Sequence, residues 1–282
     1  MNPAIVFIIL AVIASTIKKV LDRYVAVRAS VFSFAIVTQF LASLLFLPFA
    51  LPYLALPASR AAWIALGLGC IIWTIMSLTI YLAIKKAEVS IKEPLHQSKL
   101  IWTLLFGALF LGESLTTTKI VGTIIIFVGL AVLLFHPERK LGRLTEPDVL
   151  WTLGHALLGA IAVIVDKNAL TYFAPEAYGF IVYLVPGILL TMALPKKYPE
   201  VKNLLKAHAV PTLATITLAT AAYFFALQAY ARADATVVYP MLQLSTILAV
   251  IAGIVVLRER EHRWQKIAAT VLVIIGAIVL RL

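Results

Sequence analysis

The sequence predicts an all-α integral membrane protein, with ten transmembrane helices arranged as two inverted five-helix repeats around a central cavity. Composition, the spacing of apolar segments and an internal repeat support this prediction. Hydrophobic residues make up 62% of the 282 residues and charged residues only 13%, and the mean hydropathy is +1.01. Ordinary globular domains are about 45–50% apolar and about 25% charged. A soluble core of this length does not need so much apolar surface, so we expect the folded chain to lie largely in lipid.

The first half of the chain holds five of the expected helices. A transmembrane helix needs about 20 mostly apolar residues. The opening stretch MNPAIVFIILAVIAS lacks a basic leader and a convincing cleavage site, so we expect a membrane span rather than a removable signal. The turn-forming stretch LPYLALPASR separates the second helix from the third. The five segments lie at about residues 3–22, 30–51, 62–84, 89–111 and 118–135.

The second half holds the other five. It begins after the charged stretch FHPERKLGRLTEPD, and its own connections, such as PKKYPEVKNLLK and LREREHRW, carry the remaining charge. None of these connections is long enough to fold as a separate soluble domain. The segments lie at about residues 148–166, 177–194, 210–231, 235–257 and 264–281.

Two stretches of the chain share several landmarks at a single offset of 146 residues. KKAEVSIKEPLHQSKL (85–100) aligns with ARADATVVYPMLQLST (231–246). The pairs at this offset are Glu88 with Asp234, Pro94 with Pro240, Gln97 with Gln243 and Glu113 with Glu259. We therefore expect two diverged five-helix repeats, residues 1–143 and residues 144–282. The two paired glutamates Glu113 and Glu259 lie at helix ends, where a capping or loop role is expected.

An odd number of helices in each repeat makes the second copy enter the bilayer from the opposite side. Such inverted repeats build secondary transporters, with the substrate site near the membrane midplane and alternating access by rocking of one half against the other. The repeat therefore predicts a two-sided transport path as well as a fold.

Four motifs carry a family resemblance: YLAIKKAEVSIKEPL (81–95), ALFLGESLTTTKIVGTIIIFVGLAVLLF (108–135), FALQAYARADATVVYPML (225–242) and AGIVVLRER (252–260). Between them, the four motifs contain an Ala-Leu pair, a small-residue turn, a proline within the fourth helix, and Leu-Gly-Glu before a glycine-containing fifth helix. With these motifs the chain resembles ten-helix members of the drug/metabolite transporter superfamily, of the EamA type. The resemblance covers essentially the whole chain. It implies a solute carrier for metabolites such as amino acids or sugars.

The fourth expected helix begins with polar groups that lipid would penalise. Lys92, His96 and Lys99 follow i, i+4, i+7 spacing and share one face, and Glu93 and Gln97 form a neighbouring stripe. A charged side chain at the bilayer centre costs at least about 2.5–3.5 kcal/mol on insertion scales, whereas lysines near a helix end can snorkel to the interface. We expect this face to line a water-filled cavity and to bind substrate; a long interfacial end is the alternative.

Other substrate-binding candidates are aromatic, hydroxyl and amide groups on stripes of neighbouring helices. Such groups can surround a solute, although ordinary helix packing is the alternative. They are Trp73, Ser77 and Tyr81 on the third expected helix, Tyr223 and Gln228 on the eighth, and Gln243 on the ninth.

Coupling or gating is assigned to titratable residues and prolines in or near the spans. Proline removes a backbone donor and kinks a helix, so matched prolines predict broken helices at a gate, with first-turn prolines as the alternative. The two Asp-basic pairs, at 22–23 and 166–167, are expected to be ion pairs that change between transport states, or else ordinary helix ends. The candidates are Asp22, Glu93, Pro94, His155, Asp166 and Pro240. Proton coupling by Glu93, His96 or His155 is a hypothesis.

No enzyme motif is found in the sequence. H-E-x-x-H, G-x-S-x-G and the P-loop are absent, as is an Asp-rich metal cluster, and a single cysteine (Cys70) permits no internal disulfide. We therefore predict no enzyme activity, no metal and no cofactor. The predicted function is secondary active transport of a small polar metabolite by alternating access. A lipid flippase or scramblase, and a membrane-embedded enzyme acting on a lipid-linked substrate, are the alternatives.

The expected partners follow from the charge of the chain. The lysines of the first half favour an anionic or zwitterionic solute, such as an amino acid or organic acid. The formal charge of +11 suits anionic lipid headgroups of the bilayer rather than nucleic acid. A proton or another ion is the candidate coupling partner, and monomer and homodimer both stay open.

Ten spans place both termini on the same side of the plasma membrane. Nineteen of the 24 basic residues lie on the opposite side, and the termini side holds only Arg60, Lys119, Lys167, Arg232 and Arg281. The positive-inside rule therefore predicts termini outside the cytoplasm, whereas the family resemblance implies termini inside. We follow the charge rule.

Overall fold

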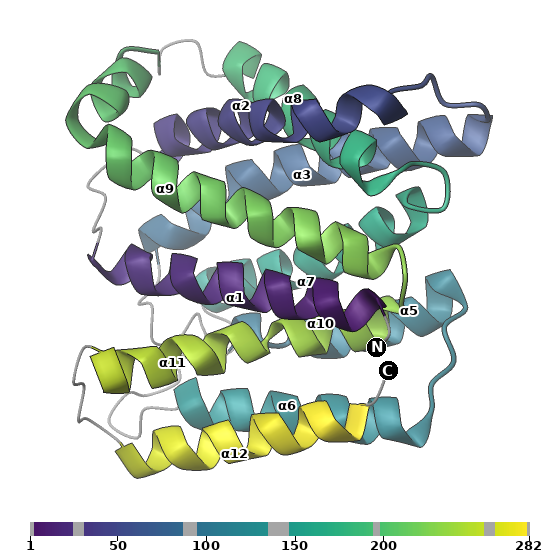
Figure 1. The fold of residues 1–282 in the computed structure, drawn as a ribbon, viewed down its shortest axis with the longest axis vertical. Helices are drawn as coiled ribbons and strands as arrows, with labels where there is room; N and C mark the ends of the chain where they lie inside the picture. The colour runs from purple at the N-terminus through teal and green to yellow at the C-terminus, as the bar shows by residue number, and fades with distance from the viewer. Residues whose placement is uncertain are drawn as a thin grey trace. The chain divides into compact units, whose positions relative to one another are not determined.

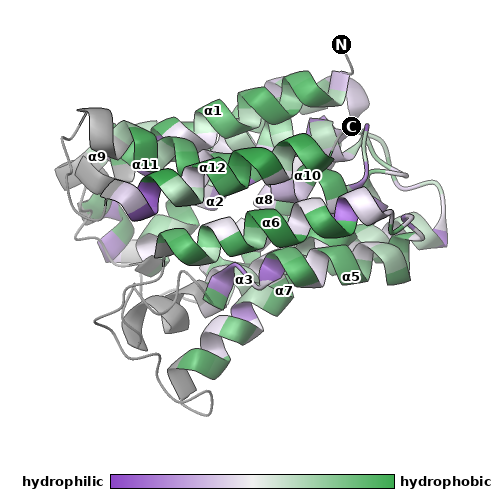
Figure 2. Ribbon diagram, turned by 90° about the horizontal axis from the view of Figure 1, so that it is seen from below, coloured by the Kyte–Doolittle hydropathy of each residue, from purple (hydrophilic) through white to green (hydrophobic). Residues whose placement is uncertain are grey.

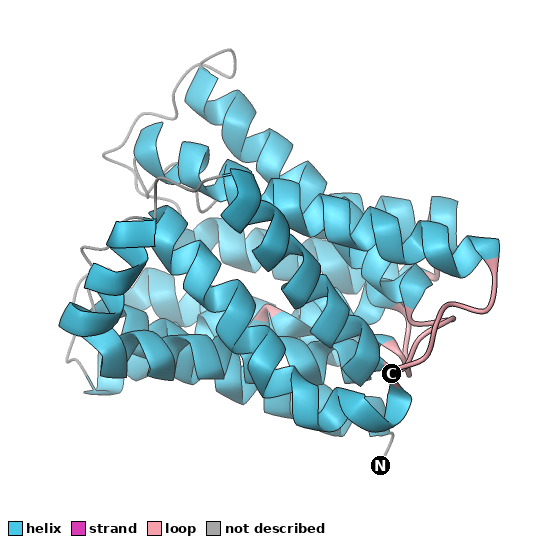
Figure 3. Cartoon of the chain, turned by 90° about the horizontal axis from the view of Figure 1, so that it is seen from above, coloured by secondary structure: helices cyan, strands magenta, loops and turns pink. Residues whose placement is uncertain are grey.

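The computed structural model describes residues 3–24, 31–86, 95–134, 147–193, 198–256 and 263–280. Every regular element within these ranges is a helix (Figure 3). The elements are α1 (Pro3–Tyr24), α2 (Val31–Ala50), the 3-10 turn η1 (Leu51–Tyr53), α3 (Arg60–Lys86), α5 (Lys99–Leu111), α6 (Thr117–Leu134), α7 (Pro147–Ala169), α8 (Pro175–Ala193), α9 (Tyr198–Tyr230), α10 (Ala235–Leu242), α11 (Leu244–Val256) and α12 (Arg263–Leu280).

Most of these helices are apolar along their length. In the described ranges, seven segments are long and apolar enough to cross a membrane by length and composition, namely Pro3–Leu21, Phe32–Tyr53, Arg60–Thr79, Val149–Ala169, Pro175–Ala193, Ala209–Tyr230 and Ala235–Ala252. Three shorter apolar helices are Lys99–Leu111, Thr117–Leu133 and Trp264–Leu280. Apolar residues run along α6 and α12 in Figure 2, and large apolar side chains such as Phe110 and Ile278 remain exposed. Exposed apolar surface of this extent indicates a multi-pass membrane protein.

The described chain forms two compact units. Unit 1 comprises Pro3–Leu78 and Val165–Arg232, and unit 2 comprises Thr79–Ile164 and Ala233–Leu282. In unit 1, α1 packs along α9 and α2 packs against α8 and α9 (Figure 1). In unit 2, α6 packs along α12 and α5 packs against α10. Each half of the sequence therefore contributes helices to both units.

The helices of the two units pack through different kinds of residue. In unit 1 an aromatic and aliphatic cluster centres on Phe46, Tyr178 and Leu227, all of them buried. In unit 2 two glycines bring α6 and α12 into close contact. A Cβ atom on Gly276 would lie 2.8 Å from the carbonyl oxygen of Gly122, a separation that real Cβ atoms do not adopt. Small residues at this crossing let the two backbones approach, as at many helix contacts in membranes.

The N-terminus of α10 is capped by a residue from the first half of the chain. Helix α5 ends at Gly112, whose φ of 67° lies in the left-handed region and suits glycine. The next residue, Glu113, accepts backbone hydrogen bonds from Ala235 (2.7 Å) and Thr236 (2.9 Å). Nearby, Lys119 Nζ lies 2.6 Å from Asp234 Oδ2. The capping role expected of Glu113 is therefore confirmed, although the helix it caps is α10 rather than a neighbour in sequence.

The ninth expected helix is divided into α10 and α11 by a turn at Gln243. Pro240 is the sixth residue of α10, so it lies beyond the first turn, and a first-turn role is excluded for this proline. The first half breaks at the matching glutamine, because Leu95 and His96 are helical, Gln97 and Ser98 form a turn, and α5 begins at Lys99.

The eighth helix begins earlier than the sequence predicts. Helix α9 starts at Tyr198, whereas the apolar run predicts a start near residue 210. Pro199 occupies its second position, where the fixed φ of proline suits a helix start. The apolar run marks only the part of the helix that matches hydrocarbon, and a polar extension such as EVKNLLK can continue the same helix in water.

Candidate functional site

A buried carboxylate lies at the centre of a hydrogen-bonded cluster in unit 1. Asp166 is only 1% exposed. Its Oδ1 accepts hydrogen bonds from Trp73 Nε1 (3.0 Å) and the Tyr178 hydroxyl (2.7 Å), and its Oδ2 accepts one from the Tyr223 hydroxyl (2.9 Å). All three donors are neutral. The cluster joins α3, α7, α8 and α9 through a single acidic side chain.

The positions of these residues along their helices explain why they meet. Asp166 lies within the last turn of α7, and Tyr178 lies in the first turn of α8. A short connection between these two helices brings their facing ends together. Trp73 and Tyr223 approach from α3 and α9, further from the helix ends. The carboxylate therefore lies near the facing ends of α7 and α8, beside the middle of α3.

Aromatic rings surround the same carboxylate. The ring of Tyr223 stands nearly perpendicular to that of Tyr183 (87°, centroids 5.4 Å apart) and to that of Trp73 (72°, 5.2 Å). Phe46 packs beside them, with its centroid 5.7 Å from that of Tyr183. Trp73, Tyr183 and Tyr223 are each partly exposed, in contrast to Asp166. Aromatic rings therefore pack around a buried carboxylate.

A second cluster in unit 2 is basic. The rings of His96 and His155 lie side by side, with centroids 5.6 Å apart. His155 Nδ1 lies 3.2 Å from Thr79 Oγ1, and the tautomer of the histidine decides which group donates. Lys99 Nζ lies 4.5 Å from the centroid of the Tyr239 ring, close enough for a cation–π contact.

The stem of Lys99 crosses α7 at a glycine. A Cβ atom on Gly159 would lie 3.1 Å from Lys99 Cδ and 3.3 Å from its Nζ, so the missing side chain makes room for the lysine. Lys99 and His96 therefore turn toward α7 and α10 within unit 2. This is the orientation required of a polar helix face that lines an interior site.

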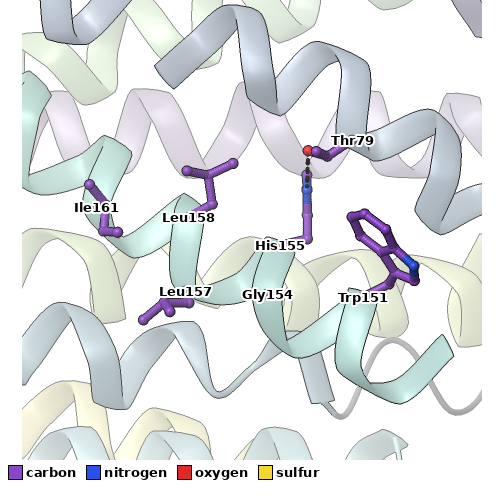
Figure 4. Close-up of a pocket in the computed structure, with 7 residues that line it drawn as sticks. All are labelled: Thr79, Trp151, Gly154, His155, Leu157, Leu158 and Ile161. Carbon is purple, nitrogen blue, oxygen red and sulfur yellow. Dashed lines mark hydrogen bonds between the residues drawn. The ribbon is translucent and has the colours of Figure 1, made fainter. Parts of the chain in front are cut away.

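A cavity of about 290 Å³ lies beside His155 in unit 2. Figure 4 shows His155 directed at Thr79, with Trp151 next to it. The lining residues are Thr79, Trp151, Gly154, His155, Leu157, Leu158 and Ile161. Its volume is close to the lower limit of about 300 Å³ for small-molecule sites, and its wall is apolar apart from the Thr79–His155 pair.

Three further predicted site residues take part in other local networks. Ser77 Oγ donates to the Trp73 carbonyl (2.9 Å) and accepts from Gln39 Nε2 (2.9 Å). Gln228 Nε2 donates to Glu176 Oε1 (2.5 Å), and Arg232 donates to Gln228 Oε1. Gln243 lies at the break between α10 and α11. These contacts place Ser77 beside the Asp166 cluster and Gln228 at the end of α9.

The structure gives fewer side-chain contacts, or none, for the remaining candidate residues. Gln97 is buried at the turn before α5. Asp22 and Tyr81 lie in α1 and α3, and their side chains are outside the described part of the chain. Lys92, Glu93 and Pro94 lie entirely outside the described residues, as do Glu88 and Glu259. The expected partner of Asp166, Lys167, donates from Nζ to the Tyr230 carbonyl (2.6 Å).

Several residues at these clusters were not predicted from the sequence. Tyr178, Tyr183, Gln39, Thr79 and Tyr239 all contact predicted site residues. One weak signal was available for Tyr239, which precedes Pro240 on the motif shared by the two repeats. Nothing in the pattern pairs Tyr178 with Asp166, because that contact depends on the turn between α7 and α8. Within the described ranges, no three His, Cys, Asp or Glu side chains gather into a metal site.

Ionisable side chains buried among membrane-spanning helices mark solute or ion pathways. The fold and the two clusters therefore define a multi-pass membrane protein of the solute-handling class. The chain belongs to the EamA-like transporter family, whose model matches residues 2–135 and residues 147–282. The family resemblance inferred from the sequence is thus confirmed.

Known proteins with similar sequences point to a metabolite transporter rather than an enzyme. A protein of Rickettsia conorii named S-adenosylmethionine uptake transporter is 26% identical over 262 residues, covering 89% of this chain and 83% of the relative. A protein of Rickettsia prowazekii with the same name is 24% identical over 265 residues, covering 90% and 84%. One crystal structure, described only as that of a protein, matches with a TM-score of 0.74 and 14% identity over 98% of this chain and 95% of the other. The last comparison concerns the fold alone.

Proposed function

We propose that this protein is a secondary active transporter that carries a small zwitterionic metabolite by alternating access, with S-adenosylmethionine as the first candidate substrate. The observation that carries the proposal is the basic cluster of unit 2. His96 and Lys99 lie on either side of the turn that precedes the apolar helix α5. His96 contacts His155 of α7, and Lys99 lies against Gly159 of α7 and Tyr239 of α10. A cation held in this way suits a solute that bears a carboxylate.

The transport mechanism in this proposal is that of a ten-helix inverted repeat, residues 1–143 and 144–282. Two features support the repeat. The family model matches once in each half of the chain. Corresponding helices also have equal lengths, since α5 and α11 have 13 residues each and α6 and α12 have 18 each. Inverted repeats of this kind give a carrier two related halves that open to opposite sides in turn.

The substrate in this proposal follows from the names of the relatives. S-adenosylmethionine carries a carboxylate, an ammonium and a sulfonium. Its amino-acid group is zwitterionic, as the sequence predicts for the solute, and the sulfonium makes the whole molecule a net cation. The proposal places the protein in the plasma membrane, with both termini outside the cytoplasm on the charge rule.

Counterflow in proteoliposomes tests the proposal without knowledge of the coupling ion. Liposomes that contain the purified protein are loaded with unlabelled S-adenosylmethionine and diluted into a trace of the radiolabelled compound. We expect transient accumulation of label above that in protein-free liposomes. A parallel panel of amino acids, organic acids and phosphorylated sugars as competitors identifies the substrate class. Absence of counterflow with S-adenosylmethionine, together with competition-sensitive exchange of another solute, would reassign the substrate.

A pair of matched variants tests the basic cluster. Lys99→Met keeps the length of the side chain and removes its charge, so we expect uptake to fall about tenfold or more, as for loss of a buried charge contact. Lys202→Met makes the same change on an exposed residue of α9 and is expected to retain wild-type uptake. Unchanged transport by Lys99→Met would remove the basic cluster from the mechanism.

A further inference from the structure

The cavity of unit 2 lies beside the basic cluster, and the proposed function does not yet use it. Most of its wall comes from one face of α7, where Trp151, His155 and Leu158 follow i, i+4, i+7 spacing. Thr79 of α3 completes the polar part of the wall. Small-molecule sites in proteins have this composition, with a mostly apolar lining and a few polar groups that fix the orientation of the ligand.

Two ring systems stand one helical turn apart on the wall. Trp151 and His155 extend from the same side of α7 (Figure 4). Gly154 lies next to both in the wall, and a Cβ atom added there would have no atom within 4 Å. A flat group can therefore lie beside the Trp151 ring, which is 42% exposed. Paired aromatic rings attract one another beyond the burial of apolar area alone, so this wall favours a planar ring over an aliphatic chain.

The polar pair adds a directional contact. His155 Nδ1 lies 3.2 Å from Thr79 Oγ1, and this contact helps to hold the imidazole in place. The other ring nitrogen, Nε2, can then pair with a ligand, since a neutral imidazole has one donor and one acceptor nitrogen. A nitrogen-containing aromatic ring carries hydrogen-bonding groups at its edge. A lipid acyl chain, the competing occupant of an apolar cavity, carries none.

His155 also joins the cavity to the basic cluster. Its ring lies beside that of His96, with centroids 5.6 Å apart. Leu158 of the cavity wall is followed directly by Gly159, against which the Lys99 side chain packs. A solute whose carboxylate binds at the basic cluster can therefore extend along α7 into the cavity.

We infer that this cavity binds a planar, nitrogen-containing aromatic ring of the transported solute, such as a purine base, against Trp151 and His155. The inference rests on the proposed function in that the ring and the carboxylate belong to one solute. S-adenosylmethionine has both groups. Its two ends can be tested separately, because 5′-methylthioadenosine keeps the purine without the carboxylate and methionine keeps the carboxylate without the purine.

Competition of each fragment against radiolabelled S-adenosylmethionine measures the two ends on the purified protein. Trp151→Leu should weaken 5′-methylthioadenosine about fivefold or more, the lower end for a base stacked on an aromatic side chain, and should leave methionine unchanged. Lys99→Met should weaken methionine and leave 5′-methylthioadenosine unchanged. Trp151→Phe keeps a ring and should keep most of the affinity for the purine. The matched control is Trp264→Leu, on a residue of α12 that is 82% exposed, which should bind both fragments like the wild type.

Photolabelling gives a readout that needs no variant. Irradiation of the wild type with 8-azidoadenosine, followed by peptide mapping, should place the label on α7 or on the end of α3 around Thr79, and excess S-adenosylmethionine should prevent it. A label on other helices would overturn the inference. Equal binding of 5′-methylthioadenosine by the wild type and Trp151→Leu would also overturn it and would leave the cavity to a lipid chain.

The inference and the proposed function fail in different ways. If S-adenosylmethionine is transported and Trp151→Leu binds it normally, the transporter proposal stands and the role of the cavity is refuted. If S-adenosylmethionine does not bind, the proposed substrate is wrong, and thermal shift with 5′-methylthioadenosine then tests the cavity directly. Stabilisation of the wild type that is reduced in Trp151→Leu but not in Trp264→Leu supports the cavity site; equal stabilisation of all three proteins, or of none, refutes it.

Discussion

The cap that Glu113 places on α10 gives a stability prediction that can be worked from the structure. Glu113→Ala removes the acceptor of two backbone hydrogen bonds, from Ala235 and Thr236. A hydrogen bond to a charged group contributes about 1.5–3 kcal/mol, and loss of a helix cap costs about 0.5–2 kcal/mol. Glu113 is partly exposed, so water can replace some of what is lost. We expect a loss of about 2–4 kcal/mol in the free energy of unfolding.

The assay is thermal unfolding of the purified protein in detergent. For domains of 150–250 residues, 1 kcal/mol shifts Tm by about 2–4 °C, so Glu113→Ala should lower Tm by roughly 4–16 °C. Glu113→Gln keeps one carbonyl acceptor and should show about half the effect. The comparison variant is Asp234→Ala at the same junction. Its ion pair with Lys119 has side-chain exposures of 9% and 46%, and exposed pairs contribute about 0–1 kcal/mol.

The order of these effects tests the reasoning. If Asp234→Ala lowers Tm more than Glu113→Ala does, the ion pair rather than the cap holds α10. A Glu113→Ala protein that melts within 1 °C of the wild type would show that the two backbone groups find other partners at no cost.

Three further predictions concern packing, the lysine path and topology. Gly276→Ala would place a Cβ atom 2.8 Å from a backbone carbonyl of α6, so Tm should fall by several degrees. The control Gly67→Ala has no atom within 4 Å of the added carbon and should melt like the wild type. Equal Tm values for the two variants would show that α6 and α12 can separate. Gly159→Ala should reduce uptake with a small change in Tm, because the three atoms nearest to the added Cβ atom all belong to the flexible side chain of Lys99. A normal uptake rate would mean that this position of Lys99 is not needed. A cysteine added after Leu282 should react with a membrane-impermeant maleimide in intact cells, since the charge rule puts the C-terminus outside; labelling only after permeabilisation would reverse the topology.

The sequence predicts the all-helical, membrane-spanning class of fold well because hydropathy is a property of long segments. Apolar runs predict helices whatever their tertiary contacts, and the matched glutamines Gln97 and Gln243 both mark helix breaks in the structure. Helix ends are less predictable. The polar start of α9 lies outside the apolar run, so hydropathy alone places the helix start too late.

The candidate site is predicted less completely. Helical periodicity indicates which residues share one face of a helix, but it does not indicate which other helix packs against that face. His96 and Lys99 both lie against α7, although a turn at Gln97 and Ser98 interrupts the helix face that the sequence predicts for them. Trp73, Tyr223 and Asp166 were each selected for separate reasons, and only the fold shows that they meet. The contact between Asp166 and Tyr178 joins two helix ends across a turn, and no spacing rule encodes that turn geometry. Sequence reasoning therefore finds polar residues in apolar helices more readily than it finds their partners.

The interleaved composition of unit 2 has a consequence for biosynthesis. Its helices come from residues 79–164 and 233–282, so the ribosome synthesises them in two segments separated by the second segment of unit 1, residues 165–232. Until the second segment of unit 2 enters the membrane, the glycine face of α6 lacks its neighbour α12, and the carboxylate of Glu113 lacks the amides of α10. The contacts that complete the packing of unit 2 therefore form only after residues 233–282 have been synthesised.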